Sequence, residues 1–166
     1  PNAELVTYDA YTYAAALDAA QEVFGNRALP VYDLSATELV VSFQADFLGD
    51  YNANSLETSY AAARKPGANM LRHIQVESNM SLTGANADTR IKQKPSAVNK
   101  TLVEVYNAIV GGGTSDKVAS EIAKELQAKG NKAVVFADGS KASYVLAHLI
   151  NQKLGSVAFT GKANLL

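Results

Sequence analysis

Cysteine is absent from this 166-residue sequence, and histidine occurs only twice, as His73 and His148. Without cysteine the chain can form no disulfide, no thiolate zinc site, no cysteine-ligated iron–sulfur cluster and no cysteine nucleophile. Two histidines cannot by themselves build a histidine-rich metal site. The sequence therefore predicts no metal site in this chain.

Charged residues are also scarce, at 19% of the chain, against about 25% in a typical soluble domain. Lys and Arg number 15 and Asp and Glu 16, so the net charge is −1, which argues against a basic nucleic-acid-binding protein. No run of about 20 apolar residues is present, so no segment is predicted to span a bilayer. The apolar fraction of 48% is enough for a folded core, and a surface poor in charge suggests burial against other protein.

Short apolar segments alternate with helical patterns along the chain. Predicted strands cover residues 4–8, 38–43, 70–77, 89–93 and 132–137, and a further one begins within 157–160. Predicted helices cover residues 13–24, 59–64, 95–110, 116–129 and 141–154, and residues 78–86 are predicted to be a polar loop. This alternation predicts an α/β fold, a mostly parallel sheet with helices on both faces.

Three consecutive glycines mark the expected domain boundary. We expect an α/β domain over residues 1–110, a linker over 111–113, and the start of a second α/β unit over 114–166. The first residue is Pro1, and no signal peptide is recognisable, which suggests a processed chain or an excerpt of a larger one.

Two glycine-containing segments are candidate anion sites. Gly111–Gly113 follows a helix and lacks the GxxxxGK[ST] pattern, so a linker is expected there, and no GxGxxG motif occurs. Residues 137–140 lie between a predicted strand and helix, where backbone N–H groups can hold an anion. Asp138 would oppose an anion, so an ordinary strand-to-helix turn is the alternative.

Nucleophilic and basic side chains show no catalytic pattern. Ser42, Ser78 and Ser81 lie outside any GxSxG motif, and no base is placed beside them by sequence. His73 alternates within a predicted strand and His148 adjoins the apolar positions of a predicted helix, so packed or surface roles are expected. No catalytic residue is predicted.

Four carboxylates are expected near the carboxyl edge of the predicted sheet: Asp46, Asp50, Glu77 and Asp88. Ligands of open α/β sheets bind at this edge. The position alone defines no reaction, and a solvated or capping role is the alternative for each side chain.

Three ordered segments resemble the molybdopterin-oxidoreductase superfamily. Residues 28–48, ALPVYDLSATELVVSFQADFL, resemble a segment of that superfamily, and in particular of the large iron–sulfur subunit of alternative complex III, a bacterial quinol:cytochrome c oxidoreductase. Residues 76–90, VESNMSLTGANADTR, are similar to a second segment of that subunit. Residues 145–155, VLAHLINQKLG, resemble a third segment of the superfamily. The resemblance implies a molybdopterin-oxidoreductase-like fold.

One departure bears on cofactor binding. Members of the superfamily that bind the molybdopterin guanine dinucleotide carry an RPGTD motif whose acidic residue helps to hold the guanine. Here the matching residues 94–98 read KPSAV, with Ser96 in place of the glycine and Val98 in place of the acid. The resemblance therefore implies a degenerate pocket and no cofactor in this chain. If the pocket binds after all, its contacts would come from Asp46, Glu77, Thr83 and Asp88.

By resemblance, the chain is a cofactor-free structural domain of a membrane-bound respiratory complex on the periplasmic face of the bacterial inner membrane. It would scaffold the iron–sulfur region and dock other subunits, including haem-c and integral-membrane quinol-binding subunits. Iron–sulfur clusters and haem c would belong to the rest of the complex. The alternative is a cofactor-binding domain of an active molybdopterin oxidoreductase. An independent small α/β hydrolase or nucleotide-binding domain is a third possibility, which no motif supports.

Overall fold

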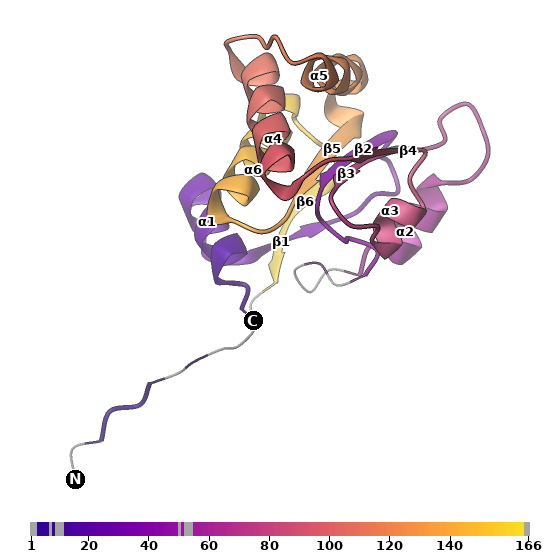
Figure 1. Cartoon of the computed structure of the whole chain (residues 1–166). Coiled ribbons are helices and arrows are strands. Elements are labelled where there is room, and N and C mark those ends of the chain that lie inside the picture. The colour runs from indigo at the N-terminus through magenta and orange to yellow at the C-terminus, as the bar shows by residue number, and fades with distance from the viewer. Residues whose placement is uncertain (1–2, 7, 9–11, 50, 52–54, 165–166) are drawn as a thin grey trace.

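The computed structural model describes residues 3–6, 8, 12–49, 51 and 55–164, and the side chains up to residue 160 (Figure 1). A four-stranded sheet forms its centre, with strand order β4-β3-β2-β5. All neighbouring strands of this sheet run parallel. Its strands are β2 (Leu39–Phe43), β3 (Arg72–Glu77), β4 (Thr89–Lys92) and β5 (Ala133–Ala137).

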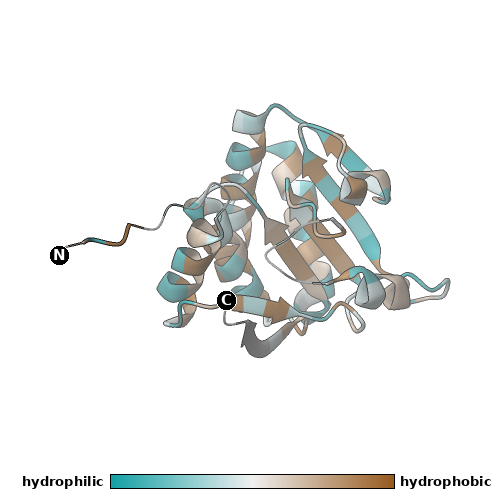
Figure 2. Ribbon diagram, turned by 90° about the horizontal axis from the view of Figure 1, so that it is seen from below, coloured by the Kyte–Doolittle hydropathy of each residue, from teal (hydrophilic) through white to brown (hydrophobic). Residues whose placement is uncertain are grey.

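Helices connect these strands and cover both faces of the sheet (Figure 1). They are α1 (Ala14–Phe24), α2 (Glu57–Ala63), α3 (Leu82–Ala85), α4 (Pro95–Val110), α5 (Lys117–Lys129) and α6 (Lys141–Leu154), with a 3-10 turn, η1 (Gly130–Lys132), before β5. Helices α4 and α5 pack on one face of the sheet, whereas α2 and α3 lie on the other. In Figure 2 the strands carry both hydrophobic and hydrophilic stretches, and the outer sides of the helices are mostly hydrophilic.

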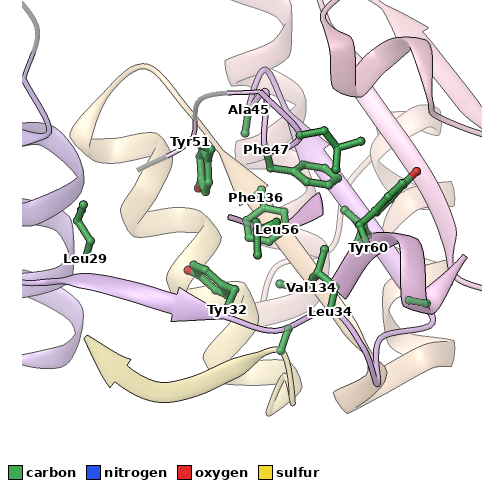
Figure 3. Close-up of a cluster of buried hydrophobic side chains, with 14 of the residues drawn as sticks. Leu29, Tyr32, Leu34, Ala45, Phe47, Tyr51, Leu56, Tyr60, Val134 and Phe136 are labelled. Carbon is green, nitrogen blue, oxygen red and sulfur yellow. The ribbon is translucent and has the colours of Figure 1, made fainter. Parts of the chain in front are cut away.

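The two faces of the sheet bury different side chains because successive residues of a strand point to opposite sides. On the face covered by α4 and α5, β3 contributes Ile74 and Val76 to an apolar core. On the opposite face, β2 and β5 contribute Val40, Val134 and Phe136 to a second core that includes aromatic rings (Figure 3). The strands are therefore buried on both sides, as expected of a parallel sheet between helical layers.

A second, two-stranded sheet pairs β1 (Leu29–Tyr32) with β6 (Phe159–Asn164) in antiparallel orientation. It packs over the second core, where the Tyr32 ring lies 5.0 Å from that of Phe136, measured between centroids. Helix α1 precedes β1 and packs beside α6 (Figure 1). This ribbon thus joins the beginning and the end of the folded chain.

The side chain of Asn151 on α6 covers the outer edge of the sheet. Its Oδ1 accepts a hydrogen bond of 2.7 Å from the backbone N–H of Val135, and its Nδ2 donates one of 2.8 Å to the carbonyl of the same residue. Both bonds occupy groups of β5 that a further strand would otherwise pair with. Since an open edge invites pairing with another chain, Asn151 closes this side of the sheet.

The expected fold class is confirmed: the chain is α/β, with a parallel sheet and helices on both faces. Two local predictions are wrong. Residues 3–6 and 8 form no strand, because within the described chain no neighbouring strand pairs with them. The predicted loop 78–86 contains α3, a helix of one turn, which is too short to produce a periodic pattern. Strand β1 was not predicted.

Residues on the two sides of Gly111–Gly113 share the central sheet. Strand β5 follows these glycines and pairs along its whole length with β2, which precedes them. Helix α4 also packs against both α5 and α6. The division into residues 1–110, 111–113 and 114–166 stays a prediction.

Candidate functional site

The candidate site is the carboxyl edge of the sheet, where the connections leave in different directions. The helices that follow β2 and β3 lie on one face, whereas α4, which follows β4, lies on the other. Ligands of open α/β sheets bind where such connections diverge. A hollow of about 370 Å³ lies at this point, lined by Ser78, Lys92, Gln93, Lys94 and Pro95.

The loop after β2 turns sharply at Gln44, whose φ of 61° lies in the left-handed region. Only a small percentage of non-glycine residues adopt this conformation, and it needs support from its surroundings. The Gln44 N–H donates a 2.9 Å bond to the carbonyl of Val76, and its Oε1 accepts a 2.8 Å bond from the Ser78 hydroxyl. These bonds hold the loop against the end of β3.

Asp46, two residues further on, binds the short helix α3. Its Oδ1 accepts hydrogen bonds from the Thr83 N–H, at 2.9 Å, and from the Thr83 hydroxyl, at 2.6 Å. The Thr83 Oγ1 in turn accepts a 2.9 Å bond from the N–H of Leu48. Thr83 is fully buried. Asp46 and Thr83 are therefore engaged with each other and fix the loop after β2 to α3.

Glu77 binds the same helix from the end of β3 and is 2% exposed. Its carboxylate forms an ion pair with Arg90 and accepts hydrogen bonds from the hydroxyl and the N–H of Ser81 and from the Gln75 amide. Burial by itself would raise the pKa of Glu77, but these hydrogen bonds outweigh it and hold the pKa below its ordinary value. Glu77 is thus a buried, fully partnered carboxylate.

Gly84 lets α3 approach this carboxylate. A Cβ atom at Gly84 would lie 1.9 Å from Glu77 Oε1, far inside van der Waals contact. The sequence LTGA of α3 therefore needs glycine at this position for the contact with β3.

A buried polar row runs along β3 from His73 through Gln75 to Glu77, on the face opposite Ile74 and Val76. The Gln75 amide nitrogen donates to Glu77 Oε2 at 3.2 Å, so its Oε1 faces the Nε2 of His73, also at 3.2 Å. This arrangement places the imidazole proton on Nε2 and leaves Nδ1 as an acceptor. The Tyr60 hydroxyl lies 3.1 Å from Nδ1 and 3.2 Å from the carbonyl of Asn86, so its one proton is shared between these two acceptors. Burial lowers the pKa of His73 to about 4, so the ring is neutral at pH 7.

Asp88 lies away from the other carboxylates, at the amino edge of the sheet, because it precedes β4. It accepts hydrogen bonds from the N–H of His73 and from Arg64, with which it forms an ion pair. The expectation that it shares the carboxyl edge with Asp46 and Glu77 is therefore wrong. Asp50, the remaining predicted carboxylate, lies outside the described residues.

The serines considered as nucleophiles each donate a hydrogen bond to an oxygen. Ser42 donates to the carbonyl of Ala45, Ser78 to Gln44, and Ser81 to Glu77. None of these acceptors is an imidazole, and His148 lies elsewhere, on α6, with its Nδ1 3.3 Å from the Tyr32 hydroxyl. None of these three serines is therefore paired with a base that could activate it.

The turn at residues 137–140 begins α6. Ser140 caps this helix by accepting a 3.1 Å bond from the Ser143 N–H, and Asp138 accepts bonds from Gly139 N–H and the Tyr144 hydroxyl. The turn is thus held by its own side chains, with a carboxylate at the place where an anion would bind.

Ser96 and Val98, the positions that depart from the guanine-binding motif, lie in the first turn of α4. Ser96 is exposed, whereas Val98 is 1% exposed and packs in the core between α4 and the sheet. Val98 therefore points away from the hollow at the carboxyl edge. No group of three or more metal-ligating side chains occurs among the described residues.

Sequence reasoning missed Gln75, Arg90 and Tyr60, which complete the polar network. The strand sequence HIQVE offered one signal, since its polar residues recur at every second position. Arg90 and Tyr60 contact Glu77 and His73 from other elements, β4 and α2. Such contacts between elements cannot be predicted from residue spacing.

No protein-family model matches this sequence, and no curated protein matches it either. Within the described residues, no helix is both long and apolar enough to cross a membrane.

Proposed function

We propose that this chain is a cofactor-free structural domain of a membrane-bound respiratory quinol:cytochrome c oxidoreductase. It is similar to the molybdopterin-oxidoreductase-like domain of the large iron–sulfur subunit of alternative complex III. In this role it scaffolds the iron–sulfur region and docks other subunits, including haem-c subunits, at the periplasmic face of the membrane. Electrons pass through the iron–sulfur clusters and haem c of the other parts of the complex.

One observation supports this role: the polar side chains at the carboxyl edge already form hydrogen bonds and an ion pair with one another. Asp46 is bonded to Thr83, and Glu77 to Arg90, Ser81 and Gln75. A cofactor that used these groups would first have to break bonds that hold α3 and the loop after β2. Their arrangement suits a fixed scaffold better than a binding cleft.

The residues present do not fit a molybdopterin guanine dinucleotide. Where the superfamily motif has its acidic residue, Val98 packs into the core, so no carboxylate is available there to accept hydrogen bonds from a guanine. Restoring the acid would place a charge in an apolar core, which is strongly unfavourable.

The second candidate is a cofactor-binding domain of an active molybdopterin oxidoreductase. The hollow beside Lys92 and Lys94 favours it, because its volume of about 370 Å³ lies within the usual range of ligand pockets and two cations line it. The neighbouring carboxylates are engaged elsewhere, which makes this the weaker candidate.

Cofactor content separates the two candidates. The complex that contains this chain would be purified gently from its native membrane, and molybdenum and oxidised-pterin fluorescence would be measured per mole of the polypeptide. A ratio near zero is expected. A ratio near one would overturn the scaffold role in favour of the active enzyme.

Partner content tests the docking role independently. A tagged copy of the full chain, recovered from the same membranes, is expected to carry polypeptides that contain haem c and iron–sulfur clusters, detected by haem staining and electron paramagnetic resonance. Recovery of the chain without them, under conditions in which an established respiratory complex stays intact, would contradict the proposal.

A further inference from the structure

A separate pocket of about 260 Å³, which shares no lining residue with the polar network of β3, lies between the carboxyl ends of α1 and α6 and the ribbon of β1 and β6. Its walls include Phe24, Tyr32, His148, Ser156 and Phe159. Neither the proposed scaffold role nor the polar network of β3 uses these side chains.

Aromatic rings form one wall of this pocket. Phe24 and Phe159 stack with their ring centroids 5.0 Å apart and their planes at 19°. The imidazole of His148 lies 5.0 Å from the ring of Phe24, tilted by 56°. A further planar ring can pack against such a wall in the offset or edge-on geometries that aromatic groups prefer.

The size of the pocket limits its occupant to a small molecule or a single side chain. An apolar cavity of about 150 Å³ is enough to bind benzene. The pocket described here is larger, at about 260 Å³, and therefore has room for one six-membered ring with a small substituent.

His148 supplies a polar group beside the rings of Phe24 and Phe159, in a pocket that Asn151, Gln152 and Ser156 also line. The residue is 4% exposed, and its Nδ1 lies 3.3 Å from the Tyr32 hydroxyl. Its other nitrogen, Nε2, has no hydrogen-bond partner among the described residues. Burial lowers the pKa of His148 to about 4, so at pH 7 the imidazole is neutral and Nε2 is either a donor or an acceptor, depending on the tautomer.

A hydroxyl group suits this nitrogen in either tautomer because it both donates and accepts hydrogen bonds. A second polar atom, Ser156 Oγ, is buried in the same wall without a partner in the described part of the chain. Buried polar groups without partners are unusual in folded proteins and call for an explanation.

We propose that this pocket binds a phenol ring, which packs against Phe24 and Phe159 and places its hydroxyl on Nε2 of His148. The ring belongs either to a free monocyclic phenol or to a tyrosine side chain of another protein. The site is independent of the proposed scaffold function.

Binding is measured on the full chain by isothermal titration calorimetry at pH 7, with phenol and with toluene as the matched ring without oxygen. Phenol is expected to bind more tightly than toluene. In His148→Phe, which keeps an aromatic ring but removes both nitrogens, phenol affinity is expected to fall by about tenfold while toluene affinity stays unchanged, as for loss of one hydrogen bond. No phenol binding, or equal affinities for the two probes in the wild-type chain, would overturn the proposal.

Nuclear Overhauser effects in the wild-type chain locate the ligand even if the variant fails to fold. Contacts between phenol protons and the rings of Phe24 and Phe159 are expected, and contacts only elsewhere would refute the site. N-acetyl-tyrosinamide distinguishes the two sources. If it binds in the pocket as phenol does, a tyrosine side chain fits; if only phenol binds, the ligand is a free small molecule.

Discussion

The contact between Gly84 and Glu77 depends on the absence of a single methyl group. In Gly84→Ala, the new Cβ would lie 1.9 Å from Glu77 Oε1, so the carboxylate or α3 must move. Movement would weaken the ion pair with Arg90 and the bonds from Ser81. We expect the free energy of unfolding, measured by urea denaturation, to fall by about 1–3 kcal/mol.

Gly67 provides a matched control for this substitution. A Cβ atom at Gly67 would meet nothing within 4 Å, and its φ is not in the left-handed region. Gly67→Ala should therefore leave stability within about 0.5 kcal/mol of the wild type. Equal effects of the two substitutions would show that the contact between α3 and Glu77 is loose.

Because two histidines are buried, we expect the stability of the fold to decrease at acidic pH. Burial lowers the pKa of both His73 and His148 to about 4, from about 6.5 in the unfolded chain. Between these two values the unfolded state binds protons that the folded state does not, so stability falls as the pH drops through this window. The expected loss between pH 7 and pH 5 is on the order of 2 kcal/mol for each histidine.

Urea denaturation at pH 7 and pH 5 measures this loss. The substitution His148→Phe removes one of the two titrating groups. Between pH 7 and pH 5, the free energy of unfolding of this variant should therefore fall by about half as much as that of the wild type. The buried carboxylate of Glu77, whose pKa is lowered, contributes only at lower pH, as the pH falls through its folded pKa. A stability that is equal at pH 7 and pH 5 would contradict the neutral, buried state of the histidines.

At the scale of elements, the Asn151 side chain hydrogen-bonds α6 to the edge strand β5. Replacing Asn151 by Leu would leave the N–H and carbonyl of Val135 buried without their partners. We expect a loss of about 2–4 kcal/mol in the free energy of unfolding and faster hydrogen exchange at the Val135 amide. Lys153→Ala, at an exposed position of the same helix, should change neither quantity appreciably.

The elements that the sequence predicted are those whose pattern is carried by their own residues. Helix α4 has an apolar stripe that includes Leu102 and Val105, and β2 is a short apolar run buried on both faces. Strand β1, by contrast, contains Pro30, is four residues long and pairs with a strand from the other end of the chain. Its existence depends on tertiary pairing, which no local pattern reports.

The sequence predicted the position of the candidate site at the carboxyl edge of the sheet, but not the hydrogen-bond and ion-pair partners of its side chains. Asp46 and Glu77 lie at the carboxyl edge because each closely follows or ends a parallel strand. Asp88 was assigned to the wrong edge because the helix α3, which returns the chain to the start of β4, was not recognised. Partners such as Arg90 come from the packing of one element on another.

At the scale of the whole molecule, the central sheet makes the two parts of the chain depend on each other. A fragment of residues 1–110 lacks β5, α5 and α6, and it exposes the apolar face of β2 around Val41 as well as its outer edge. We expect this fragment to show no cooperative unfolding transition by circular dichroism, whereas the full chain does. Cooperative unfolding of the fragment would support the predicted boundary at Gly111–Gly113.

The order of strands in the sheet also has a consequence for folding during synthesis on the ribosome. The central strand β2 is among the first parts to be made, but its partner β5 follows α4 and α5 in the chain. Until β5 has left the exit tunnel, one side of β2 offers unpaired backbone groups to any neighbouring nascent chain. Chaperones that shield this edge, or a slower rate of synthesis that spaces the chains apart, would therefore affect the yield of native protein more than its final stability.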